Sequence, residues 1–369
     1  MAEKSFLTMI ITIYTTFTIA SANSIRGGYY PSWAQSSFPP SAIKTHLFTH
    51  LYYAFLSPDA VSFQFNIPAD TQLLLTNFTA AVHASRRRVK ALFSVGGASE
   101  GAALFSRMAS TSSSRAAFIR SSIQTARRFG FDGVDLDWEF PEDSGDMRNL
   151  GLLLQEWRVE VEKDGGGRRP PLLLTAAVYY SADAFLSGAA RAYPVDSIVR
   201  NLDWINVMNY DYRGAWDTAA TGAHAALFDP RSNLSTSFGL GSWIRVGVPK
   251  SKIIMGLPLY GRTWRLRDRS DDGVGAPAVG VGPGEGGVLT YAEVVRFNRE
   301  EKAKVAYDRE TVSAYSVAGT SWVGYDDAMV VTVKARYARR LGLRGYFFWA
   351  ISYDHNWTLT TRAALAWSV

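Results

Sequence analysis

The chain has 369 residues, of which 47% are hydrophobic and 20% charged, so it can bury the core of one barrel-sized domain or two smaller ones. Its net charge is +6, but the basic residues are scattered along the chain, and this pattern does not indicate a nucleic-acid-binding surface. Cysteine is absent, which excludes a disulfide framework, thiolate metal sites and cysteine catalysis.

The first 22 residues are typical of a secretory signal peptide. Lys4 precedes an apolar stretch from Phe6 to Ile19, and Ala20-Ser21-Ala22 fits the small-x-small cleavage pattern. A membrane anchor is the alternative, but the stretch is short and rich in threonine for a span. We therefore expect a secreted, extracellular protein without membrane contact after cleavage, and the vacuole is the alternative destination. Sequons that would accept glycans in such a protein lie at Asn77, Asn233 and Asn356.

Apolar runs rich in β-branched and aromatic residues recur along the rest of the chain. The runs are Ile25–Tyr30, Leu47–Phe55, Val89–Val95, Gly133–Asp137, Leu172–Val178, Trp204–Met208, Ile253–Pro258 and Gly345–Trp349. Segments with helical spacing lie between them, among them Pro68–Ser85, Ser113–Arg128, Asp146–Lys163 and Ala328–Leu341. This alternation predicts a parallel sheet with crossover helices. With eight strands, the predicted fold class is α/β, a closed (β/α)8 TIM barrel spanning residues 23–369.

The interval after the seventh predicted strand is too long for a simple crossover. From Arg262 to about Gly324, a glycine-rich stretch is followed by alternating strand and helix signals. We therefore expect a small α+β insertion domain at residues 262–324. The glycines of residues 282–287 lack the Lys-Ser/Thr ending of a phosphate-binding loop, so they are interpreted as a flexible surface turn.

The stretch Phe131–Pro141, with the sequence FDGVDLDWEFP, carries four acids among apolar residues. Buried carboxylates are costly unless they are paired or hydrogen-bonded. In a strand, side chains alternate between faces, so Asp135, Asp137 and Glu139 would point to one face in a row. A solvated edge strand is the alternative, but it would not need the valine, leucine and tryptophan on the other face. The clustered acids therefore indicate a functional site.

Aromatic residues gather where the predicted strands end. In a β/α barrel the active site lies at the C-terminal ends of the strands. A mouth of aromatic rings around carboxylates suits sugars, whose apolar faces stack on aromatic planes; for any single ring, a place in the core is the alternative. The aromatic strand ends are Tyr29–Trp33, Tyr53–Phe55, Met208–Tyr212, Tyr260–Trp264 and Phe347–Trp349.

Metal or cofactor chemistry is not indicated by the sequence. The five histidines show no ligand spacing with the acids, and neither a Ser-His-Asp arrangement nor a cofactor motif is present. His46 and His50 are interpreted as structural residues that share one face of a strand-like segment. The other three histidines are His83, His224 and His355.

At this point a family resemblance is clear. FDGVDLDWEFP resembles the D-x-x-D-x-D-x-E signature of glycoside hydrolase family 18, the chitinases, and Ser94–Gly97 resembles the family's second signature. Met208-x-Tyr210-Asp211 and Trp349 match its sixth- and eighth-strand sites, and the long interval after strand seven resembles its chitinase insertion domain. The pattern is most similar to plant class V chitinases and covers essentially the whole mature chain.

The resemblance implies an endo-acting chitinase that hydrolyses β-1,4 bonds between GlcNAc units by a retaining, substrate-assisted mechanism. It implies that Glu139 is the acid, that Asp137 stabilises the oxazolinium formed from the substrate's acetyl group, and that Asp135 shares a proton with Asp137. Tyr210 would hold the acetyl oxygen for attack. Asp132, on the opposite phase, is interpreted as structural. Substrate-binding roles are implied for Tyr29, Phe55, Met208, Asp211, Tyr260, Arg262 and Trp349.

Three positions depart from the family pattern, and two other functions stay open. Phe140 stands where tyrosine is usual, Asn209 where alanine is common, and Ala98 where some members place a tryptophan that stacks beyond the cleaved bond. The alternatives are a chitin-binding lectin-like protein and a hydrolase for lipochitooligosaccharides or N-glycans. Lectin-like members typically replace the residue at Glu139, which is present here. We expect a monomer whose partners are chitin or chitooligosaccharides, with no nucleic acid.

Overall fold

The computed structural model describes residues 24–167, 169–183, 185 and 191–368. The predicted signal peptide, residues 1–22, lies outside the described residues. Within these described ranges, no helix is long and apolar enough to cross a membrane.

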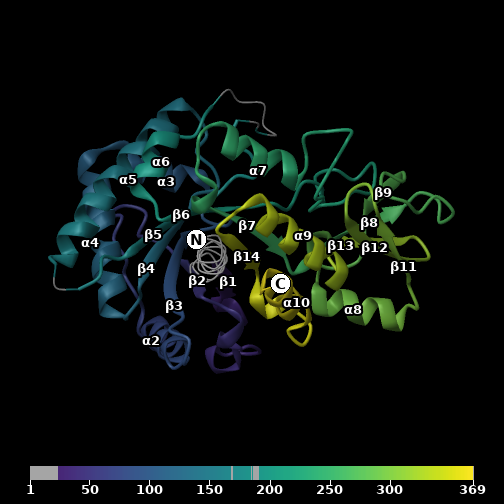
Figure 1. Ribbon diagram of the computed structural model, residues 1–369, viewed down its shortest axis with the longest axis horizontal. Helices are drawn as coiled ribbons and strands as arrows, with labels where there is room; N and C mark the ends of the chain where they lie inside the picture. Colours follow the sequence, from purple (N-terminus) through teal and green to yellow (C-terminus); the bar gives the residue numbers. More distant parts are fainter. Residues whose placement is uncertain (1–23, 168, 184, 186–190, 369) are drawn as a thin grey trace, which may run out of the picture.

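Parallel strands close into a barrel in the order β1-β14-β7-β6-β5-β4-β3-β2, which confirms the predicted (β/α)8 architecture (Figure 1). The barrel strands are β1 (Ile25–Pro31), β2 (His50–Leu56), β3 (Lys90–Gly96), β4 (Gly133–Asp137), β5 (Leu173–Val178), β6 (Trp204–Val207), β7 (Ile253–Pro258) and β14 (Gly345–Trp349). The helices that accompany them are α2 (Ala69–His83), α3 (Ala102–Ser110), α4 (Ser112–Arg128), α5 (Ser144–Gly165), α6 (Val195–Asn201), α7 (Thr236–Arg245), α9 (Ala328–Leu341) and α10 (Thr358–Ser368).

Local signals explain where these helices begin and end. Thr111 and Ser114 form a reciprocal capping box at the start of α4, and Asp143 and Asp327 cap α5 and α9 by accepting backbone N–H bonds. Helix α9 ends at Gly342, whose φ of 83° lies in the left-handed region that a glycine adopts without strain. Such caps satisfy backbone N–H and C=O groups that the helix ends would otherwise leave without partners.

The second barrel strand begins later than the sequence predicts. A short 3-10 helix, Thr45–Leu47, precedes it, and β2 starts only at His50. The N–H groups of Leu47 and Phe48 bond back to the carbonyls of Lys44 and Thr45, so they are not available to the sheet. The interpretation of His46 and His50 as residues sharing a strand face is therefore wrong, because only His50 belongs to the strand.

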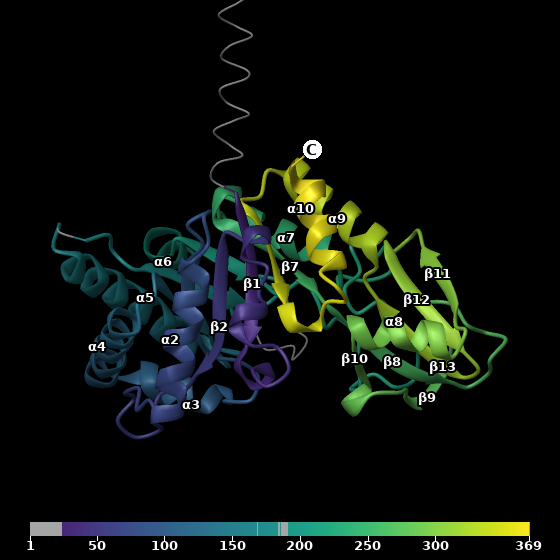
Figure 2. The same ribbon diagram turned by 90° about the horizontal axis from the view of Figure 1, so that it is seen from below.

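A second, antiparallel sheet lies beside the barrel in the order β10-β8-β13-β12-β11, with β9 on β8 (Figure 2). Its elements are β8 (Tyr260–Leu266), β9 (Ala278–Val281), β10 (Val288–Thr290), α8 (Tyr291–Glu300), β11 (Lys304–Asp308), β12 (Ser313–Ala318) and β13 (Ser321–Tyr325). The sheet starts at Tyr260, which pairs with Thr290, and not at the expected Arg262. The predicted end of the seventh barrel strand, Tyr260–Trp264, thus belongs to the inserted sheet.

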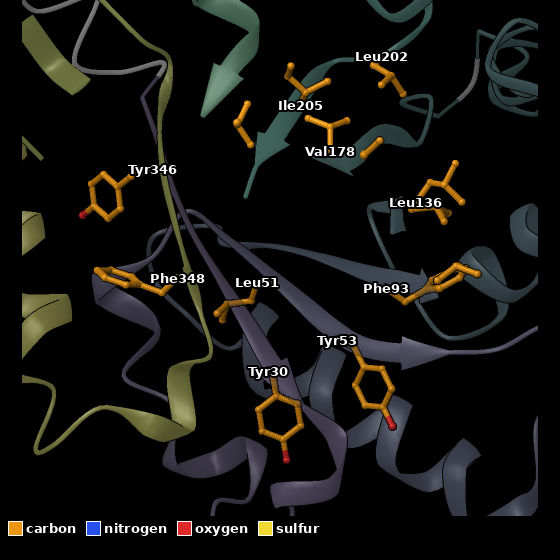
Figure 3. Close-up of a cluster of buried hydrophobic side chains, with 14 of the residues drawn as sticks. Tyr30, Leu51, Tyr53, Phe93, Leu136, Val178, Leu202, Ile205, Tyr346 and Phe348 are labelled. Atoms are coloured by element: carbon orange, nitrogen blue, oxygen red, sulfur yellow. The ribbon is translucent and has the colours of Figure 1, made fainter. Parts of the chain in front are cut away.

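Strand alternation separates two apolar regions. One fills the space between strands and surrounding helices, and Figure 3 shows members such as Tyr30, Phe93 and Leu136. The other lies in the barrel interior and includes Tyr29, Tyr52, Trp204 and Phe347. Because Leu136 faces outward, the residues on either side of it, Asp135 and Asp137, face the interior.

Candidate active site

Asp135 lies in the barrel interior with no exposed surface and four hydrogen-bond donors around it. Its Oδ2 accepts bonds from the hydroxyls of Tyr29 and Ser94, both at 2.7 Å. Its Oδ1 accepts bonds from Thr175 at 2.6 Å and from the Asn206 amide at 3.2 Å. Burial raises the pKa of Asp135, and the bonds from Thr175, Ser94 and Tyr29 oppose that rise. These donors allow a fully buried carboxyl group to exist in an apolar barrel.

Asp137 follows two positions later, at the end of β4, and is only 4% exposed. Among the described residues, its Oδ1 has no hydrogen-bond partner. Burial raises its pKa well above the usual value, and the charges of Glu139 and Asp135 add to the shift. An acid that is buried beside two others retains a proton, because like charges in close quarters cannot all ionise.

Glu139 stands just beyond the strand, at the barrel mouth. Burial raises its pKa from 4.5 to about 7, and the negative charge of Asp211 contributes to the shift. A carboxyl group with such a pKa is still protonated in mildly acidic solution and can act as a general acid. Asp137 and Glu139 thus combine a deep, proton-retaining carboxyl group with a proton donor at the mouth.

A cavity of about 110 Å³ opens above these acids and brings together most of the residues proposed from the sequence. Its lining consists of Tyr29, Phe55, Ala98, Asp137, Glu139, Ala177, Met208, Tyr210, Asp211 and Trp349. A larger cavity of about 280 Å³, between the segment 213–234 and the inserted sheet, contains none of the acids in the row. The smaller cavity is therefore the candidate active site, because it combines carboxyl groups with raised pKa values and aromatic walls.

One wall of the cavity is a set of aromatic rings at the ends of β1, β2 and β14. The rings of Phe55 and Trp349 stack with centroids 5.5 Å apart and an angle of 27°. Tyr29 meets Trp349 edge-on at 5.5 Å. Trp33 lies 6.1 Å from Trp349 and is 56% exposed, so an apolar ring continues this wall into solvent. No role was predicted for Trp33 from the sequence, although it lies in an aromatic strand end.

Tyr210 lines the cavity on the opposite side, after β6. Burial raises the pKa of its hydroxyl well above 10, and the charges of Asp137 and Glu139 raise it further. The hydroxyl therefore stays protonated and is available as a hydrogen-bond donor to a ligand. Its ring lies edge-on to those of Tyr260 and Phe347, which fixes its orientation.

Asp211 is held by a bidentate contact with Arg262 from the inserted sheet. The Arg262 Nε bonds Oδ1 at 2.9 Å, and a terminal guanidinium nitrogen lies 2.8 Å from Oδ2. Although burial would raise the pKa of Asp211, the nearby His224 ring and the hydrogen-bonded Arg262 guanidinium lower it to about 2. Arg262 and Tyr260 do not line the cavity. Substrate-binding roles were expected for both, but Arg262 contacts Asp211 and Tyr260 contacts Tyr210, so each meets the cavity through a residue that lines it.

Asp132 lies away from the cavity, on the other phase of the strand. Its carboxylate contacts the Lys90 ammonium at 2.6 Å and the His83 ring at 2.8 Å, and it accepts the Ala91 N–H at 3.0 Å. These contacts tie β4 to α2 and β3, in agreement with a structural interpretation.

Besides Trp33, three residues of this region were not predicted from the sequence. Thr175 and Asn206 bond Asp135 from β5 and β6, and Ala177 lines the cavity. The sequence could have indicated the first two, because Thr175 is the lone polar residue of the apolar strand LLTAAV and Asn206 that of WINV. Ala177 carries no comparable signal. Among the described residues, no three acidic, histidine or cysteine side chains group as metal ligands.

Comparisons with known proteins show the family to which the chain belongs. The family model "Glycosyl hydrolases family 18" matches residues 26–354. The chain is 48% identical to class V chitinase CHIT5 of Lotus japonicus, over 94% of this chain and 87% of that protein. It is 46% identical to Nod factor hydrolase protein 1 of Medicago truncatula, over 94% and 91% of the two chains.

Two solved structures extend the comparison. A class V chitinase from Nicotiana tobaccum in complex with NAG4 superposes with a TM-score of 0.89 at 38% identity, covering 94% of this chain and 99% of that one. A chitinase-like agglutinin from Robinia pseudoacacia superposes with a TM-score of 0.86 at 40% identity, covering 93% and 100%. The same fold therefore occurs in a structure described as a chitinase and in one described as an agglutinin.

Proposed function

Because this chain belongs to family 18 of the glycosyl hydrolases and is a glycoside hydrolase of the chitinase type, we propose that it is an endo-acting chitinase. It cleaves β-1,4 bonds between GlcNAc units with retention of configuration, and the substrate's own acetamido oxygen is the nucleophile. The observation that carries this proposal is the pair formed by Glu139, with a pKa of about 7, and the proton-retaining Asp137 beneath it.

Glu139 protonates the glycosidic oxygen. Burial keeps the proton on Glu139 near neutral pH, and the negative charge of Asp211 adds to this effect, because both raise the pKa of Glu139 by disfavouring its ionised carboxylate. Proton transfer from a positioned acid contributes about 10²–10⁴ to the rate of such a reaction. Once the leaving group has departed, the resulting carboxylate of Glu139 accepts a proton from the water that completes hydrolysis.

The acetamido group is held between Asp137 and Tyr210. The free Oδ1 of Asp137 accepts the acetamido N–H, and the Tyr210 hydroxyl donates to the acetyl oxygen and aims it at the anomeric carbon. Charge that develops on the oxazolinium then meets the Asp137–Asp135 pair, whose shared negative charge stabilises it. Trp349 forms the apolar floor under the sugar, with Phe55 stacked against it.

Exposed aromatic rings support an endo mode of attack. Trp33 extends one wall, and Trp216, which is 57% exposed, lies 4.9 Å from the Arg262 guanidinium on the Asp211 side. The Trp33 ring at the margin of a small central cavity suits a chain of several sugars. We also propose that the protein is secreted, as the N-terminal sequence indicates, and that it works as a monomer.

Analysis of the product anomer tests the reaction. Chitin oligosaccharides of four to six units are digested briefly, and the anomers are separated before they interconvert. The proposal requires the β-anomer at the new reducing end, since attack by the acetyl oxygen followed by attack of water inverts the anomeric carbon twice. A product that is initially the α-anomer would contradict substrate assistance.

Two other functions remain to be separated from this one. Binding of chitin oligosaccharides without turnover would indicate an agglutinin-like function, as the name of the Robinia pseudoacacia protein suggests. Preferred cleavage of lipochitooligosaccharides would indicate a hydrolase like the Medicago truncatula relative. Parallel assays with chitin hexamer, a lipochitooligosaccharide and an N-glycosylated protein distinguish the three. Retention of both Glu139 and Asp137 in the cavity favours turnover over binding alone.

A further inference from the structure

His224 lies behind Asp211 on the segment that joins β6 to α7 and is only 1% exposed. Its Nε2 is 3.1 Å from the carbonyl oxygen of Tyr260. Its Nδ1 lies 3.6 Å from Oδ1 of Asp211. The imidazole ring therefore stands between a backbone carbonyl of the inserted sheet and a carboxylate of the active-site cavity.

The partners of the two ring nitrogens indicate where the protons of His224 lie. A carbonyl oxygen can only accept, so Nε2 of His224 carries a proton and donates it to Tyr260. If Nδ1 had no proton, its lone pair would face a carboxylate oxygen of Asp211 across a buried contact. Both atoms would then be acceptors, and the arrangement would be repulsive. The geometry is favourable when both ring nitrogens are protonated, which makes the ring an imidazolium.

Backbone and side-chain contacts hold the ring in this place. The carbonyl of His224 accepts the Tyr212 N–H at 2.9 Å. The next carbonyl, that of Ala225, accepts a hydrogen bond from the buried ammonium of Lys334 on α9. Lys334 in turn contacts Asp326, the residue after β13, at 2.6 and 2.7 Å. Barrel and inserted sheet therefore both anchor the segment that carries His224.

The charges of the groups near the His224 ring sum to zero when the ring itself is neutral. Two anions and two cations surround His224, so an imidazolium adds one positive charge next to Asp211. The groups nearest the ring are Asp211 and Tyr260, with Arg262 paired to Asp211 and, close by, Lys334 paired to Asp326.

We propose that His224 is a positioning residue for the reaction: a buried imidazolium that fixes the Asp211 carboxylate and moderates the negative charge that Asp211 projects onto Glu139. This inference rests on the proposed function, because Glu139 is taken to be the acid. It assigns to the inserted sheet and to α9 an indirect part in setting the pH range of the enzyme.

Two substitutions separate the contacts of the ring. His224→Gln keeps a neutral donor near the Tyr260 carbonyl, whereas His224→Asn keeps a neutral donor near Asp211. Both remove the positive charge, so both should move the upper limb of the pH profile of kcat/KM to higher pH, by about half a unit or more. His224→Asn should raise KM less than His224→Gln, because it still contacts Asp211. His83→Gln, the same exchange at the exposed partner of Asp132, is the matched control and should move neither quantity.

A spectroscopic measurement tests the ring itself without any substrate. In a long-range ¹H–¹⁵N spectrum of histidine-labelled protein at pH 6, the resonances lost in His224→Gln should report two protonated nitrogens. Asp211→Asn should remove the Nδ1 proton from the same ring. An unprotonated Nδ1 in the wild-type protein, or an upper pH limb unchanged in both His224 variants, would overturn the inference. If the wild-type protein cleaves no chitin oligosaccharide, the proposed function fails, and the ring spectrum still decides the state of His224.

Discussion

The hydroxyl of Tyr29 on β1 donates a 2.7 Å hydrogen bond to Oδ2 of Asp135 on β4, across the barrel interior. The two strands are not neighbours in the sheet, since β1 pairs with β14 and β2. The same hydroxyl accepts a 2.7 Å bond from the Asn206 amide on β6. Tyr29 therefore links three separate strands directly beneath the cavity.

Tyr29→Phe should impair both turnover and stability. The change removes a hydrogen bond that lowers the pKa of Asp135 and leaves a buried amide of Asn206 short of one partner. A loss of about 1–3 kcal/mol in the free energy of unfolding is expected in urea titrations. The kcat should also fall, because a higher pKa of Asp135 reduces the negative charge that the Asp135–Asp137 pair carries. Tyr30→Phe is the control, since Tyr30 bonds a carbonyl on the outer side of the barrel, and its kcat should not change.

Glu139→Gln should abolish turnover and keep binding. The amide preserves the size of the side chain but has no acidic proton, so kcat should fall by about 10²–10⁴ or more. Calorimetric titration with chitin tetramer should give an affinity close to that of the wild-type protein. Glu142→Gln, an exposed change three residues along the chain, should leave kcat unaltered. A near-normal rate in Glu139→Gln would assign the acid to another residue.

The stability of the protein should depend on pH through Glu139. Its pKa is about 7 in the folded state and 4.5 when unperturbed, so the folded state binds a proton that the unfolded chain has lost between these values. The contribution of Glu139 is therefore fully present below pH 4.5 and decreases as the pH rises through 7. The difference in Tm between wild type and Glu139→Gln should fall across this window. A difference that is constant from pH 4 to 8 would mean that the pKa is not raised.

Trp349→Ala should weaken binding of chitin oligosaccharides. Loss of the apolar floor removes about 2 kcal/mol of buried apolar contact, which corresponds to about a 30-fold rise in Kd. Affinities are measured in the Glu139→Gln background so that the ligand is not consumed. Trp349→Phe retains a ring against Phe55 and Tyr29 and should lose much less affinity. Equal losses in both variants would mean that stacking is not the source of the affinity.

Lys334→Met should destabilise the protein strongly. Lys334 and Asp326 are both almost fully buried, and removal of one partner leaves the other charge uncompensated, at a cost of about 3–5 kcal/mol. Asp326→Leu combined with Lys334→Met removes both charges and should recover much of this loss in urea unfolding. If the double variant is as unstable as the single one, the Ala225 carbonyl that Lys334 also bonds is the more important contact.

The amino-acid sequence alone determined the row of acids and the class of fold. In an extended backbone, successive side chains point to opposite faces of the strand. Asp135 and Asp137 therefore share the face opposite Leu136 wherever the strand lies in the fold. Similarly, the bounds of β4, β7 and β14 agree with the prediction, because turn or helix signals on both sides of each apolar run define where the strand begins and ends.

Only the tertiary structure decided which groups surround those acids. Thr175 and Asn206 bond Asp135 because barrel closure brings β5 and β6 to it, and no local pattern encodes that proximity. Tyr260 begins a new sheet, and not the end of a barrel strand, since it pairs with Thr290, thirty positions later in the chain. His224 reaches Asp211 only through folding of the segment between β6 and α7. Protonation in this site depends on burial and on charges from distant segments, which are properties of the packed barrel and its inserted sheet.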